Sequence, residues 1–570
     1  MSALPNRIGR MTALLATTLA CAAVAATAPK PAAHAAHAAH AAAAALPPAV
    51  LQAAYDIQGR AIEAHIRFLA DDLLEGRGTG TRGYGIASRY VAGEFQKLGL
   101  EPAGSLDPSF LQPVPYMSGR IREAECNLVL QRPGNNDSLV IAEDYVYSPD
   151  LLRDKWTTDA PLAFAGFGVS APELGYDDFA RVDVRGKVIL TFRGAPAKFD
   201  HDQRAYYSNS ITKEQIAAAH GAIGILTVRR PEDEKRVDWE RIVRQTRLPA
   251  MRWTDESGAP SNTQALLELS GTLAREPLDA FFYKAPLTIE QAFAVSDSSI
   301  PQGFDLVPHL HATRVTSRDR VNSPNVVGLL RGSDPKLAKE CIVISAHLDH
   351  LGISTPVRGD SINNGAYDNA SGTAMMIEVA RAFATLKARP RRSILFLAVS
   401  GEEKGLQGSD YFARHAAPFD LRIVADINLD EVILVSKVTH VIGFGAEHSS
   451  LGPILERAAK LNGMTVVPDP RPEEVVFVRS DQFPFVKQGI PSLFPTSMLG
   501  GGPEAAAQLD EWDKTRYHSP FDDMTQHFDW ESGVRFTRMA FETAWMTAQG
   551  ALAPSWNPGD YFGNKFGTLK

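Results

Sequence analysis

Five residues of the types that bind metal ions lie far apart in this sequence of 570 residues. They are two histidines and three carboxylates: His347, Asp368, Glu403, Asp430 and His518. Three of them lie just past apolar runs at 341–346, 394–399 and 423–429. Strands buried on both faces read as continuous apolar stretches, and ligands of open α/β sheets bind outside the carboxyl ends of the strands. The pattern therefore predicts that these side chains converge on one metal site.

The ligand types indicate which metal the site would hold. Imidazole together with carboxylate favours zinc or a neighbouring transition metal over calcium or magnesium. A single catalytic zinc uses about three protein ligands and a water, so five candidates fit two metals that share one carboxylate. A serine hydrolase is disfavoured, because the chain has no GxSxG segment and its strong histidine candidates are already used.

Several linked motifs in this chain resemble the co-catalytic zinc exopeptidases of the M28 aminopeptidase type, and the resemblance extends over most of 53–567. It implies that His347 and Asp430 hold one zinc ion. Glu403 and His518 would hold the other, with Asp368 bridging the two. Glu402 would be the general base. The matching segments are SAHLDHLG (345–352), NNGAYDNASGTA (363–374), SGEEKGLQGSDYF (400–412), INLDE (427–431) and RYHSPFDD (516–523).

The positions beside the ligands carry suitable residue types. Asp349 lies two residues after His347 on the same side of an extended segment, where its carboxylate could accept the other imidazole N–H; an ordinary strand-end aspartate is the alternative. Adjacent side chains of an extended stretch point apart, so Glu403 can bind metal while Glu402 reaches the water. Asp368 directly precedes a run with helical spacing that is expected to extend through 388.

A few positions depart from the family pattern, and they bear on substrate preference more than on catalysis. Glu431 follows Asp430 where Met is expected, either as an outer ligand or as a solvated side chain. Gln482 stands where many relatives carry His, and Phe477 occupies the expected position of an oxyanion-stabilising Tyr. Arg479 is a candidate substrate-binding residue, with an outer salt bridge as the alternative.

The leading interpretation is a secreted di-zinc metalloaminopeptidase with peptide substrates. Carboxylates around the metals favour a substrate's amino group over its terminal carboxylate. Arg479 could bind a carboxylate in a bidentate fork, so a carboxypeptidase remains the alternative interpretation. Glutaminyl cyclases of this fold keep one metal, and receptor-like members are expected to have lost ligands or the base. All five ligands and Glu402 are present here, which disfavours both the cyclase and the receptor-like interpretation.

Composition agrees with a folded, exported hydrolase. The chain has 44% apolar and 22% charged residues and a net charge of −8. Nucleic-acid binding needs basic patches, which this balance does not favour. Arg7 and Arg10 precede an apolar stretch, so 1–28 is predicted to be a signal peptide that directs the protein to the periplasm or the medium. Cys21 lies in a sequence resembling a lipoprotein cleavage box, which leaves lipid anchoring as the less favoured alternative.

The remaining chain is predicted to fold as α/β, with a mostly parallel-sheet zinc exopeptidase core of the phosphorylase/hydrolase type and an inserted, β-rich protease-associated (PA) domain. Helices are expected at 61–69 and 90–98. No second stretch of about 20 apolar residues predicts a membrane span; the oligomeric state is left open. Cys126 and Cys341 could form one disulfide. The expected divisions are an Ala/His-rich spacer (29–52), the first part of the peptidase domain (53–155), the PA-type domain (156–310), the catalytic peptidase domain (311–550) and a tail (551–570).

Overall fold

The apolar runs that precede the candidate ligands form the middle of a nine-stranded sheet in the computed structural model. The structure describes residues 45–105, 109–296, 298, 300–415, 421–497 and 503–567. The predicted signal peptide, Cys21 and most of the Ala/His-rich spacer lie outside these residues. The strands, in sheet order, are β1 (Glu101–Pro102), β15 (Asn325–Leu330), β19 (Ser393–Val399), β16 (Glu340–His347), β20 (Arg422–Asn428), β23 (Ser492–Thr496), β21 (His440–Phe444) and β22 (Thr465–Val467), with β2 (Leu111–Gln112) also paired to β15.

The direction of the strands changes between the centre and the edges of this sheet. The four central strands β19, β16, β20 and β23 are parallel. At one edge β15 runs antiparallel to β19, and at the other β21 runs antiparallel to β23. The sheet is therefore mixed: β21 and β22 at the far edge are parallel to each other, and β19, β16 and β20 of the central strands bring candidate ligands to one edge.

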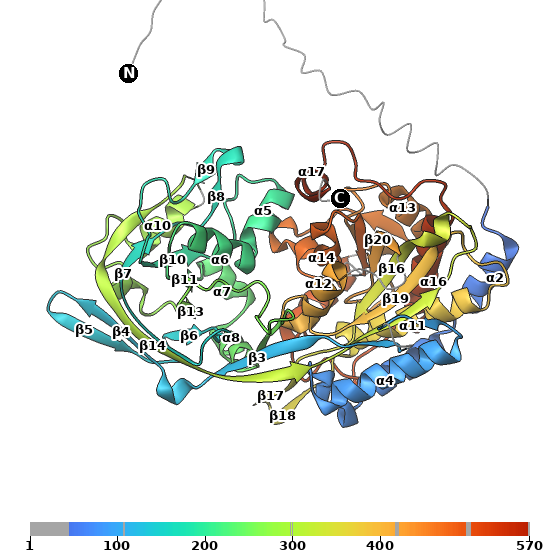
Figure 1. Ribbon diagram of the computed structural model, residues 1–570, viewed down its shortest axis with the longest axis horizontal. Helices are drawn as coiled ribbons and strands as arrows, with labels where there is room; N and C mark the ends of the chain where they lie inside the picture. The colour runs from blue at the N-terminus through green and yellow to red at the C-terminus, as the bar shows by residue number, and fades with distance from the viewer. Residues whose placement is uncertain are drawn as a thin grey trace, which may run out of the picture. The chain divides into compact units, whose positions relative to one another are not determined.

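Helices cover both faces of the central strands, as Figure 1 shows. Ile342 and Ile344 of β16 pack in the same core as α11 (Gly372–Ala384) and α16 (Trp530–Gln549). Cys341 and Val343 point to the opposite face, towards α12 (Gln407–Arg414) and α14 (Gln482–Lys487). This alternation follows from the two-residue period of a strand. It explains why the run is apolar throughout, because neither face meets water.

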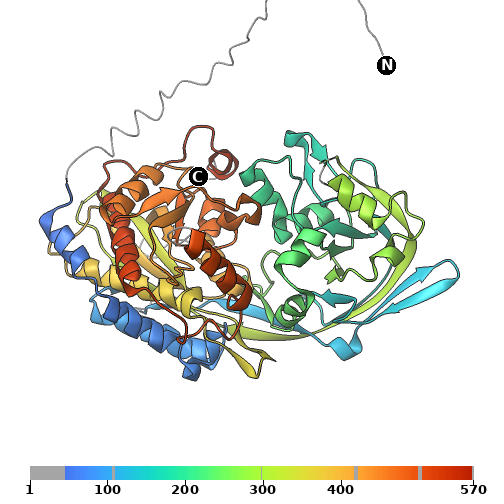
Figure 2. The ribbon, with the colours of Figure 1, turned by 180° about the vertical axis from the view of Figure 1, so that it is seen from behind.

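A second sheet, of ten strands, includes residues on both sides of the predicted 156–310 range. Its longest strand, β14 (Phe304–Asn322), pairs with β7 in its first part and with β3 towards its end (Figure 2). The strands, in sheet order, are β12 (Ala250–Trp253), β3 (Pro115–Ile121), β14, β7 (Lys155–Phe164), β10 (Val188–Phe192), β11 (Gly224–Val228), β13 (Leu269–Leu273) and β6 (Tyr145–Tyr147); β4 (Asn127–Arg132) pairs with β14 and with β5 (Asn135–Leu139).

Helices accompany the second sheet and the N-terminal part of the described chain. Helices were expected at 61–69 and 90–98, and α3 and α4 occupy these segments.

Cys126 and Cys341 are both free thiols, so no disulfide joins them. Within the described residues, none of the helices combines the length and apolarity of a bilayer span. The other helices are α2 (Pro48–Tyr55), α3 (Gly59–Leu69), α4 (Arg82–Lys97), α5 (His201–Ser208), α6 (Ser210–Ala219), α7 (Pro231–Arg236), α8 (Trp239–Thr246), α9 (Leu278–Phe281), α10 (Ile289–Ser296), α13 (Gly452–Leu461), α15 (Pro503–Thr515) and α17 (Tyr561–Phe566).

Candidate metal centre and active site

The five predicted metal ligands come together at the carboxyl ends of the central parallel strands. His347 is the last residue of β16, and Asp430 lies two residues past the end of β20. Glu403 follows β19 in a short helical turn, and Asp368 lies in the irregular turn that leads into α11. His518 follows α15 in a left-handed conformation, with φ of 53°. Strand direction thus brings distant residues to one edge of the sheet, as expected for an open α/β sheet.

Asp368 lies at the centre of this group and uses its two oxygens in different directions. Its Oδ1 is 3.1 Å from His347 Nε2, which is also 2.9 Å from Asp430 Oδ1. Its Oδ2 is 3.2 Å from His518 Nε2, which is 3.5 Å from Glu403 Oε2. The five side chains therefore form two neighbouring sets with one shared carboxylate.

His350 is a sixth candidate ligand that sequence reasoning did not select. Its Nδ1 lies 2.7 Å from Glu403 Oε1 and 3.7 Å from Asp368 Oδ2. The imidazole is fully buried; its Nε2 has no hydrogen-bond partner among the described residues, and its Nδ1 and Glu403 Oε1 face each other without the geometry of a hydrogen bond. Buried polar atoms without partners are costly. Nitrogen and oxygen donors oriented towards each other in this way fit a zinc site. The signal was present in the sequence, because His350 lies only three residues after His347 in the segment HLDH.

The prediction that the Asp349 carboxylate contacts His347 is wrong. His347 Nδ1 lies 3.0 Å from the backbone carbonyl of Asp349, which is the available acceptor for an Nδ1–H. That bond leaves Nε2 free to face Asp368 and Asp430. The carboxylate of Asp349 instead accepts hydrogen bonds from Thr79 Oγ1 at 2.7 Å and from the backbone N–H of Glu402 at 3.1 Å. Asp349 therefore fixes the turn that carries Glu402.

A buried arginine holds the loops that carry the ligands. The Arg77 guanidinium donates to the carbonyls of Leu348 at 2.9 Å, Asn364 at 2.6 Å and Gly365 at 2.9 Å, and also to that of Leu69. Burial lowers the pKa of Arg77 to about 10, so it stays charged at neutral pH. Leu348 follows His347 and Gly365 precedes Asp368. Arg77 thus joins the two ligand segments, a role that no local pattern around it indicates.

A network of side-chain hydrogen bonds holds the carboxylate of Asp430. Ser480 Oγ donates to Asp430 Oδ2. Asn428 Nδ2 donates to Ser480 Oγ at 2.8 Å and to Gln482 Oε1 at 3.0 Å. Gln482, which departs from the family pattern, therefore belongs to the support of a ligand. Phe477 packs in the core against the rings of His448 and Phe562.

The electrostatic environment separates two carboxylates that lie close in space. Burial raises the pKa of Glu402 well above its ordinary value; His347 opposes this shift, while Glu403 and Asp481 add to it. Burial alone would also raise the pKa of Asp368, but the histidines at 350, 347 and 518 hold it well below the usual range. Carboxylates whose pKa values are driven apart are suited to different tasks, one to proton transfer and one to holding a cation.

A cavity of about 740 Å³ lies beside the candidate ligands. Its lining includes Glu403, His518 and the exposed Arg479, together with residues of the region built on the second sheet. Gln245 of α8, in that region, has its side-chain nitrogen 3.3 Å from His518 Nδ1. The second-sheet region therefore reaches the candidate metal centre.

Glu431 is half-buried, and burial and the neighbouring Asp430 raise its pKa well above the ordinary value.

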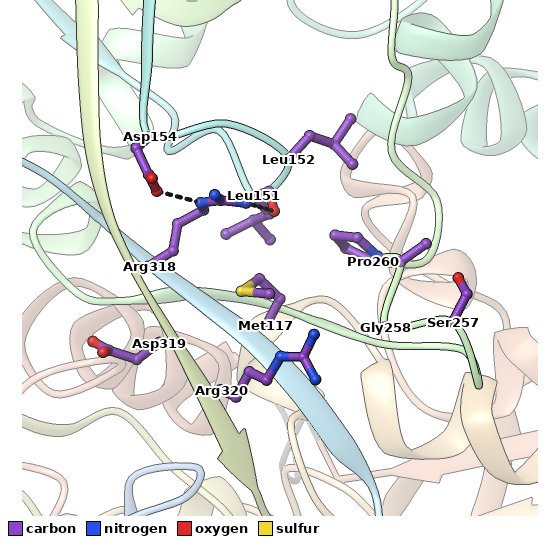
Figure 3. Close-up of a pocket in the computed structure, with 11 residues that line it drawn as sticks. Met117, Leu151, Leu152, Asp154, Ser257, Gly258, Pro260, Arg318, Asp319 and Arg320 are labelled. Carbon is purple, nitrogen blue, oxygen red and sulfur yellow. Dashed lines mark hydrogen bonds and ion pairs between the residues drawn. The ribbon is translucent and has the colours of Figure 1, made fainter.

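A separate pocket, shown in Figure 3, lies along β14 and β3. Leu151 and Leu152 line both this pocket and the larger cavity. Arg318 forms an ion pair of 2.6 Å with Asp154 there and donates to the Leu151 carbonyl. None of the predicted catalytic or metal-binding residues lines this pocket.

Another histidine and carboxylate cluster shares no residue with the first two sets. His448 is buried; its Nδ1 is 2.6 Å from Asp560 Oδ2, and its Nε2 is 3.5 Å from Asp202 Oδ1 and 3.7 Å from Glu447 Oε1. Burial opposes a positive charge on this imidazole, but the hydrogen bond to Asp560 and the charges of Asp202 and Glu447 outweigh it and raise the pKa of His448. The cluster links α5, which carries Asp202, to the start of α17.

We expect this cluster to make stability depend on pH. Because the folded-state pKa of His448 is raised, its contribution is fully present below the unfolded value of about 6.5 and is lost as pH rises through the folded value. A tenfold gain in proton affinity on folding corresponds to about 1.4 kcal/mol of stability. The thermal midpoint of His448→Gln should fall furthest below that of wild type near pH 6, with the gap closing towards pH 8.5. Asp560→Asn, which keeps the oxygen that caps Gly563, should show the same trend. A gap that widened with pH would contradict the assignment.

Comparisons with known proteins agree with this geometry. Residues 325–544 match the sequence model of peptidase family M28. A probable zinc metalloprotease of Pyrenophora teres f. teres is 38% identical over 113 residues, 20% of this chain and 23% of that protein. Aminopeptidase YwaD of Bacillus subtilis is 28% identical over 221 residues, 37% of this chain and 41% of that protein. The chain thus spans less than half the length of these curated relatives.

Among solved structures, the aminopeptidase from Aneurinibacillus sp. strain AM-1 has a similar fold. Its TM-score is 0.52 at 18% identity, and the match covers 90% of this chain and 99% of that one. Because the match covers 90% of this chain, it includes the region of the second sheet as well as the sheet that carries the candidate ligands.

Proposed function

We propose that the protein, whose residues 325–544 match the model of peptidase family M28, is a di-zinc aminopeptidase that hydrolyses the N-terminal peptide bond of peptides. One observation carries the proposal. Asp368 is shared between two sets of imidazole and carboxylate groups, and beside them the ring nitrogens of His350 and Glu403 Oε1 lack hydrogen-bond geometry to any partner among the described residues. That donor set fits two zinc ions with a common carboxylate.

The residues have distinct roles in this proposal. His347 and Asp430 would hold one zinc ion, Glu403 and His518 would hold the other, and Asp368 would be shared by the two; His350 would be a further donor beside Glu403. When bound, two zinc ions would supply polarisation of the scissile carbonyl and acidification of a water. Glu402 removes the proton of the attacking water and delivers it to the leaving amine. Asp349 keeps Glu402 in place through its backbone N–H.

The charges near the ligands support attack at the amino end of the substrate. Glu402, Asp430 and the half-buried Glu431 surround this edge of the sheet, and carboxylates attract an ammonium group. Arg479, exposed in the cavity lining, is the feature that favours the second candidate, a carboxypeptidase. Arginine is the usual partner of a terminal carboxylate.

The experiment that separates these candidates uses one peptide in three forms. We expect the zinc-loaded enzyme to release the first residue of the unmodified peptide and of its C-terminal amide, and to leave the N-acetylated form intact. Mass spectrometry of the products identifies the residue released. Release of the last residue, with amidation blocking cleavage, would overturn the proposal and assign Arg479 to carboxylate recognition. Two equivalents of zinc per chain are expected; a single equivalent would favour the cyclase interpretation.

We extend the proposal to the chain organisation and location. Residues 156–310 contribute a PA-type insertion that walls the cavity and limits substrate size, and residues 1–28 direct export to the periplasm or the medium. Mass spectrometry of the mature N-terminus in the exported fraction tests the second point. A protein that kept residues 1–28 and stayed inside the cell would contradict it, and a lipid on Cys21 would establish anchoring.

A further inference from the structure

We propose that the cavity beside the candidate metal centre binds a carboxylate of the substrate, so that the enzyme prefers short peptides with negative charge on the leaving side of the scissile bond. The inference rests on the proposed function, because it places the amino end of the peptide at the metals. It adds a substrate class and a binding site formed by three residues: Lys404, Arg241 and Arg479.

The cavity lining is strongly basic. Among its charged residues, eight are lysine or arginine and three are acidic, and one of the three is the proposed ligand Glu403. The other two acids are Asp150 and Glu214. A cleft lined by one sign of charge, with protein walls of low dielectric constant, concentrates the field on the ligand that enters it. The excess of positive charge therefore selects an anionic group.

Five of the eight cations already have partners in the protein. Arg193 forms an ion pair with Asp233 at 3.2 Å, and Arg314 forms one with Asp150 at 2.9 Å. The other three donate to backbone carbonyls: Lys213 to Phe192, Arg229 to Asp233 and Val237, and Arg252 to Met251 and Lys404. These five residues shape the wall of the cavity, and the arginines among them supply a background of positive charge; burial lowers the pKa of Lys213 to about 7.

Lys404 is different because its ammonium group makes no hydrogen bond and no ion pair within 4 Å among the described residues, although the charges of Glu403 and Asp349 act on it. The residue directly follows Glu403, is only 8% exposed and lines the cavity. The ammonium group therefore has donors left for a ligand, and its position beside a proposed metal ligand points to an anionic part of the substrate as that ligand.

Arg241 and Arg479 line the same cavity, and both interact with Tyr517. The Arg241 guanidinium lies 5.2 Å from the centroid of the Tyr517 ring, and its Nε is buried without a hydrogen-bond partner among the described residues. The Tyr517 and His518 rings are 3.9 Å apart. Arg479 is exposed, with a 3.5 Å contact from Nη1 to the Glu474 carbonyl. Both guanidinium groups have donors left for a carboxylate.

The size of the cavity fits a short peptide. Its volume of about 740 Å³ lies within the roughly 300 to 1,000 Å³ of sites that enclose a drug-sized ligand. A peptide of two or three residues, with its amino group at the acidic metal edge, has its terminal carboxylate on the basic side. An acidic side chain after the scissile bond offers the same chemical group from a second source.

The test uses the zinc-loaded full-length enzyme and two matched pairs of tripeptides. The first pair is leucyl-alanyl-alanine and its C-terminal amide; the second is leucyl-glycyl-glutamic acid α-amide and its glutamine counterpart. We expect kcat/KM about tenfold higher for the charged member, through KM, and a smaller ratio at high salt because the attraction is screened. The first pair reports the terminal carboxylate and the second the side chain. Equal rates within both pairs would overturn this inference, whereas no release of leucine from any peptide would overturn the proposed function.

Variants of two of the three cations, Lys404 and Arg479, test the site itself. Lys404→Met should reduce the charged-to-neutral ratio of kcat/KM severalfold, and Lys404→Arg should restore most of it. Lys97→Met, which removes an exposed charge on α4, is the matched control and should keep the wild-type ratio. Zinc content of each variant identifies damage to Glu403. If Lys404→Met fails to fold, the exposed Arg479→Gln serves in its place. Wild-type ratios in both variants would overturn the assignment.

Discussion

The variant Glu402→Gln is expected to keep its metals and to lose two to four orders of magnitude in kcat. General acid and base catalysis contributes about 10²- to 10⁴-fold, and the amide of glutamine cannot accept the proton of the attacking water. The geometry favours intact metal sites in this variant, because the close imidazole contacts are made by Glu403, Asp368 and Asp430. The hydrogen bond to Asp349 uses the backbone N–H of residue 402 and survives the change.

Two measurements on the same preparation check this prediction. Metal content comes from elemental analysis, and kcat comes from release of an N-terminal residue at saturating substrate. Glu511→Gln, an exposed position on α15, makes the same chemical change away from the site and should retain wild-type values. A loss of metal in step with activity would mean that Glu402 is a ligand and that the roles of the adjacent glutamates are reversed.

Asp368→Asn is expected to weaken both metal sites together. The carboxylate directs Oδ1 towards His347 and Oδ2 towards His518 and His350, so both sets depend on one side chain. A neutral amide is a poor bridge between two cations. Changes to residues that merely support a ligand cost about 10- to 100-fold in metal affinity, and loss of the shared ligand should cost at least that at each site.

Zinc titration in competition with a chelator measures the two affinities. Asp360→Asn, on the exposed hairpin of β17 (Gly352–Val357) and β18 (Asp360–Asn363), is the matched control. The backbone N–H of residue 368 bonds to Asp522, and this contact does not depend on the side chain, so the turn should keep its shape. Two equivalents of tightly held zinc in Asp368→Asn would rule out the bridging role.

Local sequence patterns predicted much of the fold. The run that ends at His347 is apolar because both faces of β16 are covered, and it was recognised as a strand for that reason. The spacing of apolar residues in α3 and α4 likewise predicted helices. The mixed direction of the sheet could not be predicted from local patterns, because β15 and β21 pair through contacts between distant segments. The extent of the second sheet was missed for a similar reason, since β14 pairs with β3 and β4, which precede residue 156.

The sequence by itself determined the chemical types and the order of the five candidate ligands, because a metal requires particular side chains and strand ends place them at one edge. Only the tertiary structure decided how they are supported. Whether His347 bonds a carboxylate or a carbonyl depends on how the chain turns at Asp349. Arg77 acts on loops nearly 300 residues away, and the burial of Lys404 in the cavity lining exists only in the folded chain. Such properties depend on distances between residues remote in sequence, and no local pattern encodes those distances.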